Sequence, residues 1–327
     1  MKKFFLSLIA TFFSVSLFAA SPEDFSLSVE PIFGMKWGQV DEYVYEKDSE
    51  GNYQKESELN WHIKNMFKVG GQIDGGFKKL KGKIHFSALI PGECGIMEDS
   101  DWMDLNDVKT TYSKSENKIT QAFDFSIELR YEFQPIKKIK IAPVLGFEYK
   151  TISFEARNGY GWYGNVVSPH VSWDDPNAVY YSKGSLCGID YHRDVKQFLL
   201  GYYFEFKPIE KIRMYESFFV CPYAYTASYD THYRNSEETI GTDYADEVYF
   251  FFKRFKYLTG CYYVFNKHWE IGFHISAFYA IGTTGTNYQK AFTSKGNRSG
   301  YKEQSGVKGG AGTWDIDASL SCRFTIF

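Results

Sequence analysis

Apolar and polar residues alternate one by one over long stretches of the chain. The alternation is clearest in residues 123–133, 269–279 and 314–326, where Phe, Ile, Tyr and Trp recur at one parity and mostly polar residues occupy the other. A period of two residues is that of a β-strand with one apolar face. These stretches therefore predict long strands that present an apolar surface on one side of a sheet.

The connections between such stretches fall into two lengths. Short connections are expected near residues 78–83, 134–138, 207–211 and 265–268, and longer polar ones near residues 46–57, 99–118, 157–188, 235–244 and 289–307. These four short and five long connections join about ten strands. Short turns on one side and long loops on the other are typical of a barrel that crosses a membrane. We therefore expect an all-β fold, an antiparallel transmembrane β-barrel of about ten strands, with short periplasmic turns and long extracellular loops.

The composition favours an exported membrane barrel over a soluble β-sandwich. Aromatic residues make up 19% of the chain, with 26 Tyr and 30 Phe, yet the mean hydropathy is −0.37. After the N-terminal segment, no apolar run approaches the ~20 residues that a membrane helix needs. Outward aromatic residues that alternate with polar lumenal residues explain both observations. A soluble sandwich has no need of such long strands with aromatic outer faces.

The first residues have the order of an export signal. Lys2 and Lys3 precede an apolar segment, residues 4–18, and small residues follow at positions 19–21. Basic, apolar and small residues in this order are typical of a cleavable signal peptide. We expect a signal peptide at residues 1–21 and a single barrel domain at residues 22–327.

The net charge and the cysteines give no indication of a nucleic-acid or metal partner. The net charge of −3 is too small to indicate a nucleic-acid partner. The five cysteines match no metal-binding spacing, and their odd number leaves at least one thiol free. Cys94 and Cys187 fall in predicted surface segments, so a disulfide between them is one interpretation. A closed barrel has no open sheet edge that requires assembly, which favours a monomer.

Two pairs of polar residues stand out for their chemistry. Asp99 and Asp101 are two residues apart, and so are Asp230 and His232. On an extended strand, this spacing points both side chains of a pair to the same face. Asp230 would orient the imidazole, neutral His232 would take a proton from water, and the opposing carboxylates would help to hold that water. The simpler interpretations are a solvated acidic loop and a structural histidine.

Other catalytic chemistries have less support. The chain carries no G-x-S-x-G, H-E-x-x-H or P-loop motif. Three Asp and one His offer fewer convergent oxygen ligands than a hard cation usually needs, so no metal site is predicted. We interpret the glycine-rich stretches 282–285 and 309–312 as bends at strand–loop junctions.

Three local motifs resemble the omptin family of outer-membrane endopeptidases. Residues 97–104 read M-E-D-S-D-W-M-D, similar to the family's M-x-D-x-D-W-M-D motif, and residues 230–233 read D-T-H-Y, similar to its D-x-H-Y motif. Residues 38–45 resemble the first outer-rim strand of the family, where a Glu helps to bind substrate. The two catalytic motifs are specific, and the resemblance extends over most of the chain after its signal segment.

The resemblance implies an endopeptidase in the bacterial outer membrane, with its active site facing the exterior. Asp230 with His232, opposite Asp99 with Asp101, would activate water against a peptide bond of a polypeptide substrate, without an acyl-enzyme intermediate. Members of the family prefer basic residues at the cleavage point, and Glu42 would be one of the acidic residues that bind them. No cofactor is implied, but lipopolysaccharide or another outer-membrane lipid would be an activator.

Two departures from the family pattern affect these expectations. Ser228 stands two residues before Asp230, where the family has its second specificity carboxylate. At the family's lipid-binding G-Y-Q-E-S-R site, residues 146–151 read G-F-E-Y-K-T, so the arginine is missing and Lys150 lies at the wrong parity. We therefore expect a shifted substrate preference and a weaker dependence on lipopolysaccharide.

Two other functions remain open for a barrel of this kind. Its loops could bind a host surface without proteolysis, as an adhesin or receptor does, through the aromatic residues Tyr160, Trp162, Tyr163, Trp173, Tyr180 and Tyr181. The same residues commonly pack loops together. A pore has less support, because a lumen of about ten strands is small and fills with its own side chains.

Overall fold

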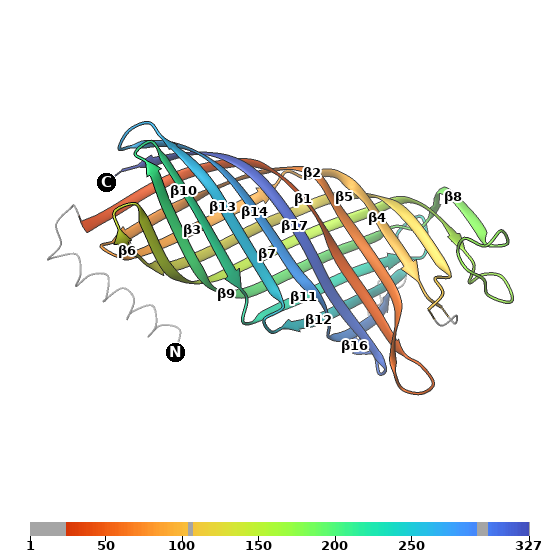
Figure 1. Ribbon diagram of the computed structural model, residues 1–327. Coiled ribbons are helices and arrows are strands. Elements are labelled where there is room, and N and C mark those ends of the chain that lie inside the picture. The colour runs from red at the N-terminus through yellow and green to blue at the C-terminus, as the bar shows by residue number, and fades with distance from the viewer. Residues whose placement is uncertain (1–23, 104–106, 293–299, 327) are drawn as a thin grey trace.

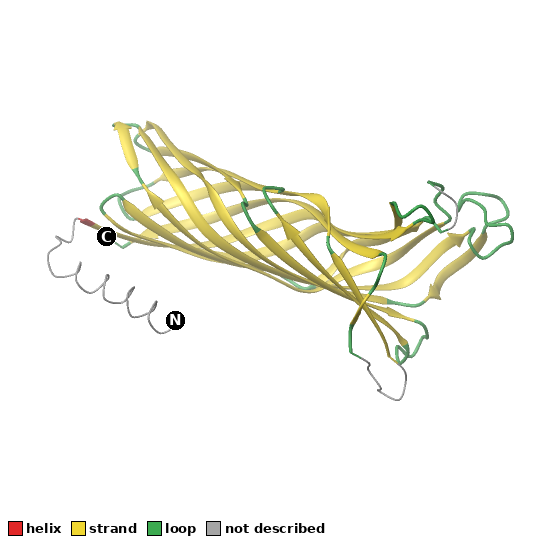
Figure 2. Cartoon of the chain, turned by 90° about the horizontal axis from the view of Figure 1, so that it is seen from below, coloured by secondary structure: helices red, strands yellow, loops and turns green. Residues whose placement is uncertain are grey.

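The computed structural model describes residues 24–103, 107–292 and 300–326. The expected signal peptide at residues 1–21 lies outside the described residues. Within the described part, no helix is long and apolar enough to cross a membrane. Strands dominate the structure, and Figure 2 shows them as one long barrel with loops gathered at its two ends.

The described residues form one antiparallel sheet of seventeen strand segments. In chain order the segments are β1 (Phe25–Lys47), β2 (Tyr53–Phe77), β3 (Leu80–Leu89), β4 (Gly92–Asp101), β5 (Thr111–Tyr131), β6 (Phe133–Ile136), β7 (Ile139–Tyr163), β8 (Val179–Leu186), β9 (Ile189–Ile209), β10 (Ile212–Val220), β11 (Ala224–Tyr233), β12 (Gly241–Phe250), β13 (Arg254–Val264), β14 (Trp269–Thr284), β15 (Thr286–Phe292), β16 (Lys302–Glu303) and β17 (Val307–Thr325).

The sheet closes on itself, because β1 pairs with both β2 and β17 (Figure 1). Several segments are halves of one strand, as β3 and β4 both pair with β2 and β5. β10 with β11, β12 with β13, and β14 with β15 are further halves. Counted in this way, the described segments form a ring of ten strands, with β6 at the foot of β7, and with β8 and β16 as short strands in the loops. The predicted barrel is confirmed.

Proline and local irregularity divide the halves. Pro91 separates β3 from β4, and Pro222 separates β10 from β11. Proline has no N–H for the ladder, so pairing stops there and resumes after a short break. We call the outer part of the barrel, on the side of the long loops, the rim. It comprises β4, β11, β12 and β15, together with the outer ends of the long strands β1, β2, β5, β7, β9 and β17.

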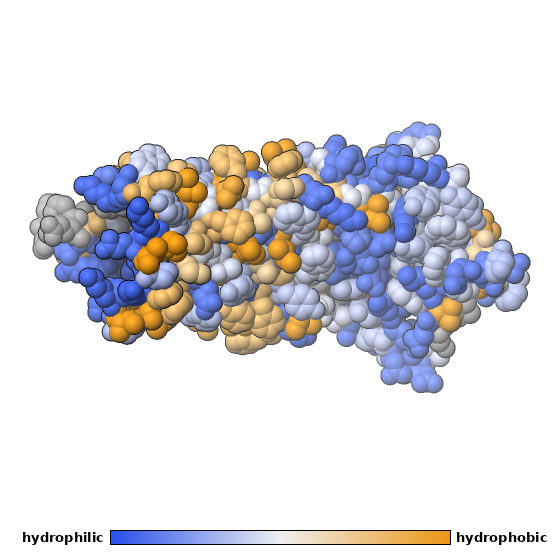
Figure 3. All heavy atoms as spheres, turned by 45° about the horizontal axis from the view of Figure 1, so that its top comes forward, coloured by the Kyte–Doolittle hydropathy of each residue, from blue (hydrophilic) through white to orange (hydrophobic). Residues whose placement is uncertain are grey.

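The strands are much longer than a membrane requires. β2 and β7 each have 25 residues, whereas about 9–11 tilted residues cross a bilayer. A band of outward apolar side chains lies towards one end of the barrel and a polar surface covers the other (Figure 3). Phe33, Leu145 and Leu320 belong to the outward set, at 62%, 61% and 59% exposed. The rim therefore stands outside the apolar band.

The loops at this end are shorter than the sequence predicts. The connection expected near residues 99–118 is a strand up to Asp101 and again from Thr111. Above the lipid both strand faces are polar, so the alternation that identifies a strand disappears while the pairing continues.

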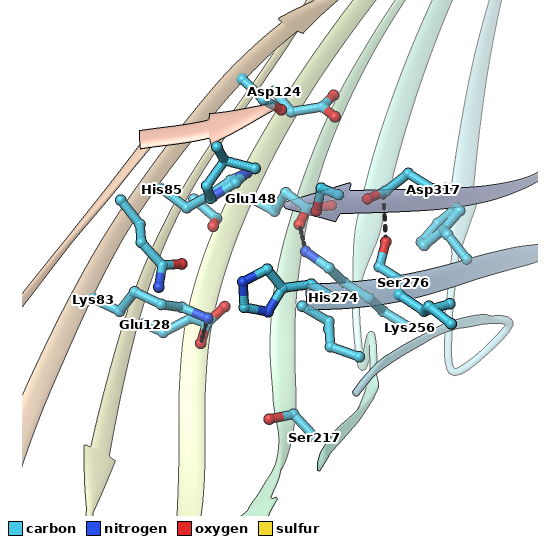
Figure 4. Close-up of a pocket in the computed structure, with 18 of the residues that line it drawn as sticks. Lys83, His85, Asp124, Glu128, Glu148, Ser217, Lys256, His274, Ser276 and Asp317 are labelled. Carbon is cyan, nitrogen blue, oxygen red and sulfur yellow. Dashed lines mark hydrogen bonds and ion pairs between the residues drawn. The ribbon is translucent and has the colours of Figure 1, made fainter. Parts of the chain in front are cut away.

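Charged side chains fill the lumen. Figure 4 shows the interior within the apolar band, where Lys256 binds Glu148 and Ser276 donates to Asp317. Lys83 and Glu128 form a further ion pair at 2.7 Å. The cavity left between these groups has a volume of about 100 Å³. Such a filled interior gives no support to a pore.

Two expectations about individual segments are wrong. All five cysteines are free, and Cys94 is buried with its thiol directed to the Asn117 carbonyl, whereas Cys187 is exposed in a loop. A disulfide between them is excluded because Cys94 points into the packed interior. Residues 309–312 form no bend, since they lie within β17 and pair with β1.

Candidate active site

The two predicted polar pairs lie on rim segments that are not neighbours in the ring. Asp99 and Asp101 end β4, while Asp230 and His232 lie near the end of β11. Alternation along β4 turns Glu98 outward, where its carboxylate accepts from His62 Nε2 at 3.0 Å. Asp99 and Asp101 therefore face the inside of the rim, as their spacing predicts.

His232 and Asp230 form a close pair. His232 Nε2 lies 2.6 Å from Asp230 Oδ2, and the two side chains are 34% and 4% exposed. The Tyr244 ring meets the imidazole edge-on, with ring centres 5.2 Å apart. A buried carboxylate that accepts from Nε2–H leaves Nδ1 as the unprotonated nitrogen of the neutral ring, so Nδ1 is the basic atom.

The two pairs lie close enough for their charges to act on one another. Burial alone would lower the pKa of His232, but the charge and hydrogen bond of Asp230, with the charges of Asp99 and Asp101, raise it above its ordinary value. Burial raises the pKa of Asp99, and the neighbouring Asp101 charge adds to this effect. Burial also raises the pKa of Asp101, against a hydrogen bond from Ser57 and the attraction of His232.

Asp99 has an acceptor atom to spare. Among the described residues, no group donates a hydrogen bond to its buried Oδ1. An unpaired buried carboxylate oxygen is costly unless a ligand or water donates to it. Within the described ranges, no cluster of three His, Cys, Asp or Glu side chains is arranged to hold a metal ion.

An aromatic cluster closes the lumen beneath the site. Trp61 stacks between Phe154 and Tyr191, with ring centres 5.3 and 5.1 Å away. The Tyr191 hydroxyl donates to Ser228 Oγ at 3.0 Å, which joins this cluster to β11. Packed apolar side chains keep the site on the outer side of the barrel and fix the strands that carry it.

Glu42 lies in the same rim, next to Asp230. Its side chain is buried at 3% exposed, and no described group donates to its Oε2. Burial raises the pKa of Glu42 well above its ordinary value, the charges of Asp230 and Asp246 raise it further, and Arg193 opposes them. Among the described residues, the Glu42 carboxylate is thus a buried acceptor with no ion pair to a cationic side chain.

Arg193 and Asp246 were not identified from the sequence. Arg193, 3% exposed, donates to the Asp41 carbonyl at 2.6 Å, to the Gly312 carbonyl at 2.8 Å and to Ser228 Oγ at 3.2 Å. Asp246, 2% exposed, lies on β12 directly opposite Ser228. Only the register between strands places these residues beside Glu42, and the pattern within one strand does not contain that register.

The aromatic loop residues contact one another. Trp162 packs against Trp173 and Tyr180, with ring centres 6.0 and 5.3 Å away, and Tyr163 meets Tyr181 at 5.0 Å. Their rings hold β7, β8 and the loop that connects them together. This packing explains the aromatic content of the loops without a binding partner.

Comparisons with known proteins agree with this architecture. The model of the Omptin family matches residues 21–314. The crystal structure of the outer membrane protease OmpT from Escherichia coli superposes with a TM-score of 0.78 at 16% identity, covering 92% of this chain and 97% of that one. The translocator domain of the autotransporter NalP from Neisseria meningitidis reaches 0.34 at 6% identity, covering 89% and 88%, which is too low to carry an argument. No curated protein sequence matches significantly.

Proposed function

The chain belongs to the omptin family, and we propose that it is an endopeptidase in which His232 activates water at the rim of the barrel. The barrel lies in the bacterial outer membrane. Family membership and the likeness in fold to an outer-membrane protease support proteolysis as the activity. The catalytic residues and the substrate preference are proposed from the geometry of the rim.

One observation carries the proposal. His232 and Asp230 are paired at 2.6 Å, and the charges of Asp99 and Asp101 reach the same imidazole from a strand on another part of the ring. Asp230 is buried and the other three groups are half-buried, and all four are directed inward from two separate strands. Such crowded charges are costly to the fold, because they are poorly solvated. A role in adhesion gives no reason to keep them.

The proposed reaction begins with water held between His232 and the Asp pair. Nδ1 of neutral His232 takes a proton from the water as its oxygen attacks the peptide carbonyl carbon. Asp230 stabilises the imidazolium that forms, as the buried carboxylate does in other histidine-dependent hydrolases. The imidazolium then gives its proton to the leaving amine nitrogen as the C–N bond breaks, which restores the neutral histidine.

Asp99 and Asp101 position the water in this proposal. Their raised pKa values mean that the pair keeps a proton more readily than exposed carboxylates do. One shared proton leaves one acceptor for the water and avoids two adjacent buried charges. The partnerless Oδ1 of Asp99 provides that acceptor.

A buried acid near the proposed site supports a proposal about substrate binding. Glu42, buried beside Asp230, would bind a basic side chain of the polypeptide substrate.

The outer face of the barrel bears on lipid dependence. Lys150 points into the lumen, where it pairs with Glu148 at 3.3 Å. On the outer face nearby, Tyr149 donates to Asp194 at 2.7 Å, so a lipid phosphate meets a carboxylate there. We propose a monomeric enzyme, open to the exterior, that does not need lipopolysaccharide.

The test is cleavage of a mixed peptide library by the refolded barrel, with the cut sites mapped by mass spectrometry. His232→Ala should lose at least about a hundredfold in rate, the lower range for a general base, while it keeps the heat-modifiable mobility of a folded barrel. His192→Ala is the matched control, because His192 lies on the outer face and bonds Ser153.

Each outcome of this test has a meaning. Full cleavage by folded His232→Ala would overturn the assignment of the base. No cleavage by the natural sequence, with or without added lipopolysaccharide, would reject the protease and favour a binding protein. Cleavage that requires the lipid would refute the proposed independence from it.

A further inference from the structure

Asp246 is a buried carboxylate directly across the β11–β12 ladder from Ser228. Asn287 donates to its Oδ1 at 2.8 Å. In a directly opposite pair of an antiparallel ladder, the side chains share one face and their Cβ atoms lie about 5 Å apart. The Asp246 carboxylate therefore enters the same space as position 228, where the family pattern has an acid and this chain has serine.

β17 places Asp246 beside Glu42. A Cβ atom added at Gly309 would meet Asp246 Oδ1 at 1.8 Å, so this carboxylate lies directly over the Gly309 backbone. Ala311, two residues further along the same face of β17, pairs with Glu42 on β1. Two residues of a strand span about 7 Å, a separation at which one extended cation can reach both acids.

The groups around Glu42 and Asp246 carry too little positive charge to balance these two acids, so a cation from the substrate would be favourable there. Arg193 directs its donors to Ser228 Oγ and to two backbone carbonyls. Burial and the Asp230 charge raise the pKa of Asp246 to about 7, against the Asn287 hydrogen bond and the Arg193 charge. Glu42 still has its partnerless, buried Oε2. With both acids ionised, Glu42, Asp246 and Arg193 sum to one negative charge.

We infer that Glu42 and Asp246 together bind one arginine or lysine side chain of the substrate at the cleaved bond, so that the acid missing at position 228 is replaced from the opposite strand. This inference rests on the proposed endopeptidase function. It predicts that the preference for a basic residue is retained despite Ser228, because Asp246 on β12 supplies a carboxylate to the same part of the site.

The first experiment measures kcat/KM for two peptides that differ only in arginine or citrulline at the cleavage point. Asp246→Asn should lower the arginine-to-citrulline ratio by about tenfold to a hundredfold, the value of one charge-assisted hydrogen bond. Asp243→Asn is the matched control, since Asp243 is a buried acid of the same strand that faces away and pairs with Lys290 at 3.2 Å. Heat modifiability verifies folding, and Glu42→Gln is a second variant with the same expected direction.

A second experiment separates this inference from the proposed function. Binding of the arginine peptide is measured in the His232→Ala background, with and without Asp246→Asn. Weaker arginine binding after Asp246→Asn supports the inference even if the natural sequence cleaves nothing. Cleavage with an unchanged ratio in folded Asp246→Asn overturns the inference and leaves the protease intact. Equal binding of both peptides also overturns it.

Discussion

Ionisable residues at the rim are placed where their charges are costly. Burial raises the pKa values of Glu42, Asp99 and Asp101, and neighbouring carboxylates raise those of Glu42 and Asp99 further. One pKa unit corresponds to about 1.4 kcal/mol. For an acid with a raised pKa in the folded protein, this cost is absent at low pH, begins as pH rises through the ordinary pKa, and is complete above the raised pKa. The fold therefore gives up stability at neutral pH to hold reactive groups in place.

The raised pKa of His232 predicts the pH dependence of cleavage. His232 must be neutral to accept a proton, and the nearby carboxylates favour its charged form. Activity should therefore be lost as pH falls through the raised pKa, so the acidic limb of kcat/KM against pH should have its midpoint above 6.5, the ordinary value for histidine. A midpoint at or below 6.5 in a natural-sequence profile would contradict the carboxylate environment proposed here.

At this scale, residues within one strand were predictable and residues across strands were not. The spacing of Asp99 with Asp101, and of Asp230 with His232, is a property of a single extended segment. Asp246 and Arg193 enter the site through the register of β12 and β9 against β11. Register depends on the closure of the whole ring, which the local pattern does not contain.

Among the elements, β17 has a glycine-rich segment that helps to position Asp246. Its start, residues 309–312, resembles a flexible bend in the sequence but is a paired strand that lets Asp246 approach the backbone. The alternation further along the strand, residues 314–326, was predicted because that part faces lipid. The rim half was not, because its glycines carry no side chains that could show an alternation, and one of them, Gly309, leaves room for the Asp246 carboxylate.

Gly309→Ala tests this role of β17. The new methyl group would overlap the Asp246 carboxylate, so Asp246 must move and the arginine-to-citrulline ratio of kcat/KM should fall about tenfold or more. Gly92→Ala in β4 is the control, because its Cβ would meet nothing within 4 Å. An unchanged ratio in a folded Gly309→Ala barrel would show that the close approach does not matter for specificity.

The whole molecule has two distinct ends, and the proposed catalytic groups on β4 and β11 share one of them with the loop between β8 and β9 (Figure 1). That loop carries Cys187, which is exposed, whereas Cys94 and Cys221 are buried. A thiol reagent outside the cell therefore has one accessible target in the described part of the rim.

This arrangement predicts the orientation of the barrel in the cell. A membrane-impermeant maleimide added to intact cells should label the protein, and Cys187→Ser should remove nearly all of the label. Cys261→Ser, at a half-buried position of β13, is the control and should retain it. Labelling that appears only after the cells are broken would place the end that carries Cys187 in the periplasm.

The length of the strands sets a limit on what the enzyme reaches. β1 has 23 residues, and at a tilt of about 35–45° a strand of this length rises roughly 54–63 Å, about 30–40 Å more than the apolar band. A protein in the same membrane whose loops stay close to the lipid lies below the proposed catalytic groups. The height of these groups above the membrane would thus protect membrane proteins with short loops from cleavage. It would direct cleavage to polypeptides that arrive from outside the cell.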